Sequence, residues 1–85
     1  MGDLKILYFA SLRETLGCGA ETLALPERVH DVAGLLVWLM ARGGEWEKLG
    51  GVKNLRYAVN QEMARQDSPL KAGDEVAFFP PVTGG

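Results

Sequence analysis

The sequence is poor in the residues that form disulfides, metal centres and membrane spans. Its 85 residues include one cysteine and one histidine. A single cysteine excludes an intramolecular disulfide, and a zinc site needs three or four clustered ligands. No apolar run is long enough to cross a bilayer, and the first residues lack the pattern of a signal peptide. We therefore expect a cytoplasmic protein without a bound metal.

The charge balance excludes a class of partner. Nine basic and eleven acidic side chains leave a formal net charge of −2, which gives no electrostatic footprint for nucleic acid. Hydrophobic residues make up 47% of the chain and charged residues 24%, as in ordinary globular domains. Because there is no repeat or linker, we expect residues 1–85 to form one domain around one small core.

The interior of the sequence offers no catalytic constellation. His30 flanks an expected helix start, and Cys18 lies between Gly17 and Gly19 without a motif or an obvious base. The same glycines lack the further glycine and the lysine of a phosphate-binding loop. The reactive group that remains is the terminal carboxylate of Gly85.

The first third of the chain predicts two strands and a short helix. Leu4–Phe9 is apolar at almost every position, as a central strand is. Ser11 and Glu14 have the spacing of a capping box for a helix over Leu12–Leu16. Glu21–Leu25 alternates in polarity and is expected to pair antiparallel with the first strand.

The rest of the chain predicts one main helix and three strands. Asp31 is the expected N-cap of the helix, and an apolar stripe follows it before Gly43-Gly44. The stripe consists of Val32, Leu35, Leu36, Leu39 and Met40. A helical turn is expected over residues 45–50, and strands over 55–59, 63–65 and 75–79. This order of elements indicates an α+β fold with the main helix on one sheet.

Val37 and Trp38 are apolar on the side of the main helix opposite the stripe, where a solvated helix is polar. We expect a loop to cover them. The alternative is a patch through which two copies of the chain associate.

The chain ends in an arm. Phe78-Phe79 runs into Pro80-Pro81, and each proline forces extended backbone on itself and on the residue before it. Val82-Thr83 and Gly84-Gly85 follow, and the glycines allow another backbone to approach closely. Residues 80–85 are therefore predicted to project as a tail that can thread a narrow channel. The alternative is a frayed glycine-rich end, but a tail that starts apolar and uncharged argues against it.

Three blocks of the sequence belong together: KILYFASLRE (Lys5–Glu14), AVNQ (Ala58–Gln61) and PLKAGDEVAFFPPVTGG (Pro69–Gly85). In this order they resemble the small subunit of molybdopterin synthase, the MoaD-type sulfur carriers of the ubiquitin-like superfamily. Residues 41–53 match in composition alone. The resemblance implies a β-grasp (ubiquitin-like) roll, with a mixed sheet, one main helix and an extended C-terminal tail.

The resemblance also implies a chemistry at Gly85. In this family an adenylating enzyme (MoeB-type) uses ATP to make an acyl-adenylate of the terminal carboxylate, and a sulfur donor converts it into a thiocarboxylate. The large synthase subunit (MoaE-type) then accepts the tail and passes its sulfur to the pterin precursor in molybdenum cofactor biosynthesis. The chain would be a non-catalytic subunit of a heterotetramer, with no stably bound cofactor. Pro81, Val82, Thr83 and Gly84 would supply reach, with Val82 anchored in the partner's groove.

Four residues of the body are candidates for binding these partners. Alternation places Phe79 on the face opposite Phe78, at the base of the arm, and Met63 lies on a neighbouring short strand. Methionine and phenylalanine suit a surface that binds two partners in turn. Phe9 falls on the second face of the first strand, and the resemblance adds Arg13 as a charged rim contact. The alternative is that Met63 and Phe79 belong to the core.

Other classes of protein share such a tail. A ThiS-type carrier of the thiamine pathway shares the Gly-Gly end, and a ubiquitin-like modifier joins a terminus of this kind to a lysine. A plain interaction module would not need the tail. The run FFPPVTGG and the length of the chain favour the molybdopterin family.

Overall fold

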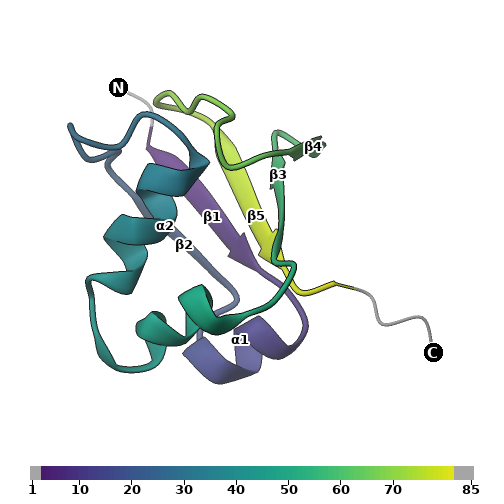
Figure 1. Cartoon of the computed structure of the whole chain (residues 1–85). Helices are drawn as coiled ribbons and strands as arrows, with labels where there is room; N and C mark the ends of the chain where they lie inside the picture. Colours follow the sequence, from purple (N-terminus) through teal and green to yellow (C-terminus); the bar gives the residue numbers. More distant parts are fainter. Residues whose placement is uncertain (1–2, 82–85) are drawn as a thin grey trace.

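The computed structural model describes residues 3–81, which form one five-stranded sheet with helices on one side (Figure 1). The elements, in chain order, are β1 (Leu4–Tyr8), α1 (Ser11–Leu16), β2 (Ala20–Leu23), α2 (Val32–Met40), the 3-10 helix η1 (Gly44–Gly51), β3 (Arg56–Val59), β4 (Glu62–Ala64) and β5 (Glu75–Phe79). Across the sheet the strands lie in the order β2-β1-β5-β3-β4. The helix α2 crosses one face of the sheet, and η1 packs against α2 and α1.

The sheet is mixed, with its first and last strands side by side at the centre. β1 pairs antiparallel with β2 and parallel with β5, and β3 pairs antiparallel with β5 and β4. One long helix across such a sheet is the β-grasp arrangement, so the predicted fold is confirmed. Strand bounds differ from the prediction by one or two residues. For example, β2 ends at Leu23 rather than Leu25, because Leu23 already pairs with Leu4, the first residue of β1.

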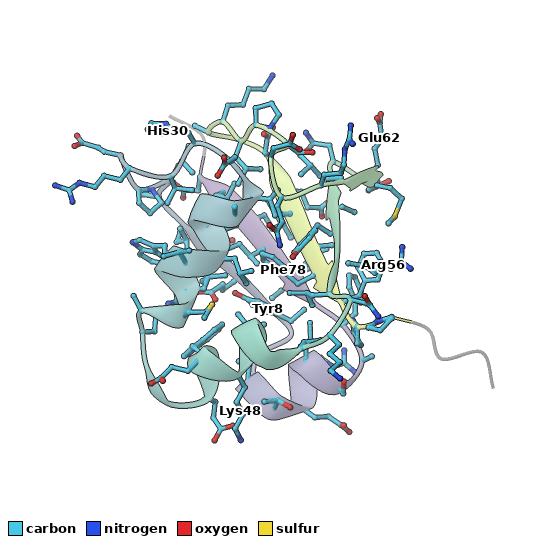
Figure 2. The ribbon with its side chains drawn as sticks, in the orientation of Figure 1. Tyr8, His30, Lys48, Arg56, Glu62 and Phe78 are labelled. Carbon is cyan, nitrogen blue, oxygen red and sulfur yellow. The ribbon has the colours of Figure 1, made fainter. Side chains whose placement is uncertain are left out.

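The core lies between the sheet and α2. Alternate side chains of β1 and β5 point into it, as predicted. The buried apolar residues are Leu4, Ile6, Tyr8, Leu12, Val29, Val32, Leu35, Leu39, Leu49, Tyr57, Leu70, Val76 and Phe78. The ring of Phe78 has its centre 6.0 Å from that of Tyr8 and 5.8 Å from that of Tyr57 (Figure 2). These aromatic contacts fix β5 at the centre of the domain.

The predicted cap and stripe of α2 are both present. Asp31 accepts a hydrogen bond from the backbone N–H of Gly34 at 2.8 Å, as an N-cap does. Three residues of the stripe are buried, and Leu36 and Met40 pack at its margin. The expected loop over the opposite side of α2 is wrong, because Val37 is 66% exposed. The chain turns after Gly43 into η1, which packs on the side of Met40 and leaves Val37 uncovered.

The predicted capping box at Ser11 is wrong. The N-cap position belongs to Ala10, which has a φ of 55° and gives the helix no side-chain hydrogen bond. Ser11 is already the first residue of α1. The first free amides are satisfied by backbone instead, because Leu12 and Arg13 donate to the carbonyls of Phe9 and Ala10 at 3.1 Å. The sharp turn that ends β1 therefore also starts the helix.

A hairpin turn fixes where β4 lies. Asn60 and Gln61 have φ values of 52° and 69°, the left-handed pair that suits a two-residue hairpin. The side-chain amide of Asn60 donates to the buried Asp74 at 3.0 Å, and its oxygen accepts from the N–H of Glu75 at 3.0 Å. These bonds tie the turn to β5. As a result β4 begins at Glu62, one residue earlier than predicted.

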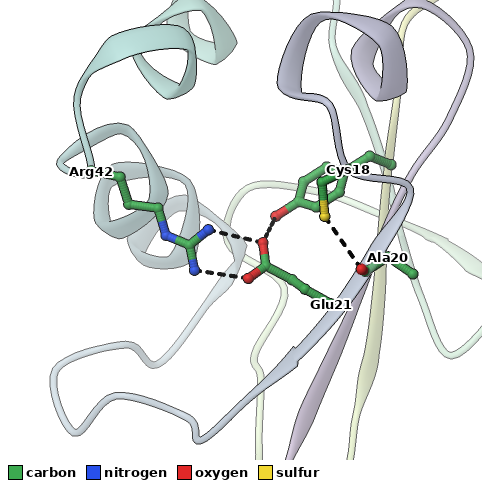
Figure 3. A network of polar contacts seen from close by, with 5 residues as sticks. Cys18, Ala20, Glu21 and Arg42 are labelled. Carbon is green, nitrogen blue, oxygen red and sulfur yellow. Dashed lines mark hydrogen bonds and ion pairs between the residues drawn. The ribbon is translucent and has the colours of Figure 1, made fainter.

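A polar network ties the end of α2 to β2 (Figure 3). The guanidinium of Arg42 donates to both carboxylate oxygens of Glu21, at 2.9 and 3.0 Å. The hydroxyl of Tyr8 donates to the same carboxylate at 2.8 Å. Burial first, and then the hydrogen bond to Glu21, raise the pKa of Tyr8. The Arg42 guanidinium also lies 4.5 Å from the ring centre of Trp46 and 5.0 Å from that of Trp38, so it joins three parts of the chain.

Acid should weaken the fold through Glu21. Partial burial alone would raise the pKa of this carboxyl, but the hydrogen bonds from Arg42 and Tyr8 outweigh it, and the pKa is lowered. A carboxyl with a lower pKa in the folded chain stabilises the fold above its unfolded pKa and loses this effect as the pH falls through the folded pKa. We expect the urea midpoint of Glu21→Gln to fall less than that of the native protein as the pH drops below about 4. Two results would contradict the role of Glu21. One is an equal fall of the urea midpoint in the native protein and in Glu21→Gln. The other is a fall for the control Glu27→Gln that is also smaller than that of the native protein.

Candidate functional site

The face of the sheet opposite α2 carries an apolar surface where the tail begins. The strand register gathers outward side chains on it in two rows. The first row across the sheet is Leu7, Ala77, Ala58 and Met63. The second row, nearest the tail, is Phe9, Phe79 and Arg56. We call the apolar members of both rows the open face: Leu7, Phe9, Ala58, Met63, Ala77 and Phe79.

Large apolar side chains of the open face are exposed to solvent. Met63 is 65% exposed and Phe9 is 46% exposed, while Phe79 and Leu7 are half-buried. The alternative that Met63 belongs to the core is therefore wrong. Phe79 lies opposite the fully buried Phe78, as predicted from alternation. A contiguous apolar surface of this kind is typical of a protein-binding site.

The base of the tail lies beside the second row. Phe79 ends β5, and Pro80 and Pro81 follow it and are half-buried. The first strand is held next to this point, because the N–H of Phe9 donates to the carbonyl of Phe78 at 3.1 Å. The other predicted tail residues, Val82, Thr83, Gly84 and Gly85, lie outside the described residues. Any partner that binds the tail close to Pro81 therefore meets the open face at the same time.

Arg13 is exposed on α1, three residues after the turn at Ala10. Its aliphatic stem lies against Gly19, where an added Cβ would come within 2.8 Å of the Arg13 Cδ atom. Glycine at position 19 thus makes room for this side chain. The guanidinium has no ion pair with another of residues 3–81. The predicted rim contact of Arg13 stays a prediction.

Sequence reasoning missed part of this surface. Leu7, Ala58 and Ala77 join the patch, and Arg56 completes its second row. The alternation of β1 and β5 predicts which of their residues point outward. The register between strands decides which of these become neighbours, and the alternation within one strand does not contain that information.

The described residues show no cluster of metal-binding side chains. Within residues 3–81 no three histidine, cysteine or acidic side chains gather as ligands. Cys18 donates a weak hydrogen bond to the carbonyl of Ala20 at 3.3 Å, and His30 is exposed. None of the helices in this part of the chain is both long and apolar enough to span a membrane. The described residues thus present an exposed apolar surface beside Pro80 and Pro81.

Comparisons with known proteins agree with this arrangement. Residues 6–85 match the model of the ThiS family. The molybdopterin synthase sulfur carrier subunit of Escherichia coli (strain K12) is 42% identical over 82 residues, which cover 96% of this chain and 99% of that relative. A putative molybdopterin converting factor subunit 1 from Pyrococcus furiosus superposes with a TM-score of 0.77 at 31% identity, covering 96% of this chain and all of that one. Small archaeal modifier protein 1 from Haloferax volcanii superposes with the same TM-score at 25% identity and the same coverage. The chain belongs to the ThiS family, and its relatives place it with the molybdopterin synthase sulfur carrier subunits.

Proposed function

We propose that this chain is the sulfur carrier subunit of molybdopterin synthase. The observation that carries the proposal is its 42% identity to such a subunit over nearly the whole of both chains. The fold adds support, because the open face lies at the root of an arm that ends in Gly84-Gly85. The proposal places the chemistry at the terminal carboxylate of Gly85.

The terminal carboxylate must be activated before it can carry sulfur, because its charge and resonance oppose nucleophilic attack. An adenylating enzyme (MoeB-type) supplies this activation. A carboxylate oxygen of Gly85 attacks the α-phosphate of ATP, and pyrophosphate leaves. A hydrosulfide supplied by the donor then attacks the acyl carbon and loses its proton, the bond from this carbon to the AMP oxygen breaks, AMP leaves, and a thiocarboxylate remains. Two easier steps replace one difficult step, as in covalent catalysis.

The body of the chain brings this terminus to its partners. The large synthase subunit (MoaE-type) accepts the tail and transfers its sulfur to the pterin precursor. The same tail must enter the adenylating enzyme first, so the open face at its root meets both proteins in turn. Phe9 and Met63, the most exposed members of the open face, suit such repeated use, because flexible and aromatic side chains adapt to different surfaces.

The decisive experiment is an intact-mass measurement of the chain after incubation with ATP, the adenylating enzyme and a sulfur donor. We expect a gain equal to the replacement of one oxygen by sulfur, and fragmentation should place it at Gly85. Omitting ATP should abolish the gain. An unchanged mass in the complete mixture would contradict the proposal.

The similarity to small archaeal modifier protein 1 favours a second candidate function. A protein modifier uses the same activated terminus to acylate a lysine of a target. Peptides that carry the C-terminal glycines of this chain on a lysine would identify that function in extracts. A ThiS-type thiamine carrier would instead restore thiamine synthesis in a strain lacking its own carrier. A molybdopterin carrier should restore only molybdenum cofactor synthesis.

A further inference from the structure

Two arginines lie at the same end of β3 and β4, next to the tail. The antiparallel register pairs Tyr57 with Ala64, so Arg56 precedes this pair on β3 and Arg65 follows it, directly after the end of β4. Arg56 also pairs with Phe79 on its other side. Figure 2 shows Arg56 near the end of β5, where the chain leaves the sheet. Arg56 therefore ends the second row, and it lines one groove together with Arg65.

This pair has no counter-charge among the described residues. The ion pairs of residues 3–81 join Arg42 to Glu21 and Lys48 to Glu45, and neither involves Arg56 or Arg65. Both arginines are exposed. Like charges held close together repel each other. None of the described ion pairs offsets this repulsion.

A shallow groove beside the pair is also free of acidic side chains. It is lined by residues 54–57 and 63–66, and it joins the two arginines to the apolar side chains of Leu55 and Met63. The nearest acids along the chain are Asp67, two residues after Arg65, and Glu62. Neither lines this groove, and Glu62 lines a different hollow with Pro69. The groove thus combines positive charge with apolar surface, and Met63 belongs to both the groove and the open face.

We propose that Arg56 and Arg65 bind carboxylates of a partner protein, on an acidic and partly apolar segment that borders the entrance taken by the tail. This inference rests on the proposed function, because it assumes that the tail enters a partner. Guanidinium groups hold carboxylates through two parallel hydrogen bonds. Two neighbouring arginines that repel each other in the free chain gain the most from such a contact.

The position of the pair selects protein carboxylates over the phosphates of ATP. Six residues, Pro80 to Gly85, separate the second row from the reacting terminus. Fully extended, they span about 20 Å. A nucleotide at the terminus therefore lies far from Arg56 and Arg65 when the tail is threaded. The surface that faces the arginines is the rim of the partner's site.

Charge reversal tests the proposal against a matched control. The variant is Arg56→Glu with Arg65→Glu, and the control is Arg28→Glu with Lys71→Glu, two exposed cations away from the tail. Both double variants change the net charge equally. Dissociation constants should be measured with the large subunit and with the adenylating enzyme at low and at high salt. We expect the variant to bind at least one of them about tenfold more weakly at low salt, and the control to change by less than about twofold.

A second measurement separates docking from a structural role. If the two arginines serve a partner, Arg65→Gln should leave the melting temperature of the free chain unchanged or raise it, because it removes a repulsion. A clear fall in melting temperature would overturn the proposal. The proposal would also be overturned if the double variant and its control weakened partner binding equally. It would likewise be overturned if the double variant lost binding to a single-stranded RNA but kept its affinity for both partner proteins. If the native chain itself binds neither protein, the proposed function has failed, and this inference fails with it.

Discussion

Deletion of Gly85 should abolish sulfur delivery and leave the fold intact. The activating enzyme must bring the terminal carboxylate to ATP, and removing one residue withdraws that carboxylate by about 3.5 Å. Misplacement by about 1 Å already costs on the order of 100-fold in rate. The buried core of the described residues extends from Leu4 to Phe78, so we expect the core to form without Gly85. We expect thiocarboxylate formation to fall by at least about 1,000-fold with no change in melting temperature.

The measurement is the rate of thiocarboxylate formation by intact mass, followed by the yield of molybdopterin with the large subunit. An added alanine after Gly85 is the matched control for geometry, since it keeps a free carboxylate but moves it outward. We expect that variant to be inactive as well. Normal activity in either variant would show that the partners do not require the terminal carboxylate at its native position.

Phe78 and Phe79 should differ sharply when each is replaced by alanine. Phe78 is fully buried between two tyrosine rings, and Phe→Ala in a core costs about 3–5 kcal/mol. A domain of this size has a total stability of roughly 5–10 kcal/mol, so Phe78→Ala should lose about half of its stability or more. Phe79 is on the open face and half-buried. Phe79→Ala should keep its fold and weaken partner binding by about 2 kcal/mol or more, roughly 30-fold.

Two measurements on the same pair of variants check this contrast. Urea unfolding should give a large loss for Phe78→Ala and a loss of less than about 1 kcal/mol for Phe79→Ala. Titration of the folded fraction against the large subunit should give the opposite order, with weaker binding by Phe79→Ala than by Phe78→Ala. If Phe79→Ala loses as much stability as Phe78→Ala, the residue belongs to the core and the open face has lost its central member.

The elements that depend on local pattern were predictable from the sequence. The apolar run of β1, the spacing of the stripe on α2 and the cap at Asp31 each have one physical reading, and the structure confirms them. The capping box at Ser11 failed because the end of β1 is tied to Phe78 by a long-range bond, and the turn that follows supplies the cap from backbone. A contact with a residue so distant in sequence leaves no signal near Ser11.

The candidate site was predictable in some of its members and not in its shape. Phe79, Met63 and Phe9 followed from alternation and from the resemblance, and the structure brings them together on the open face. The groove shared by Arg56 and Arg65 depends on the turn at Asn60 and Gln61, which sets the register of β4. A shift of that register by one residue would turn Met63 inward and separate the two arginines.

The central place of β5 has a consequence for how the protein is made. β5 is the last strand to be synthesised, yet it lies between β1 and β3 and carries the ring of Phe78 into the core. A nascent chain therefore lacks the middle of its sheet until translation has passed residue 79, and the tail follows within six residues. Because long-range parallel pairing forms late, we expect a chain that stops before β5 is complete to stay unfolded and be degraded. Folding therefore waits for the strand that directly precedes the tail.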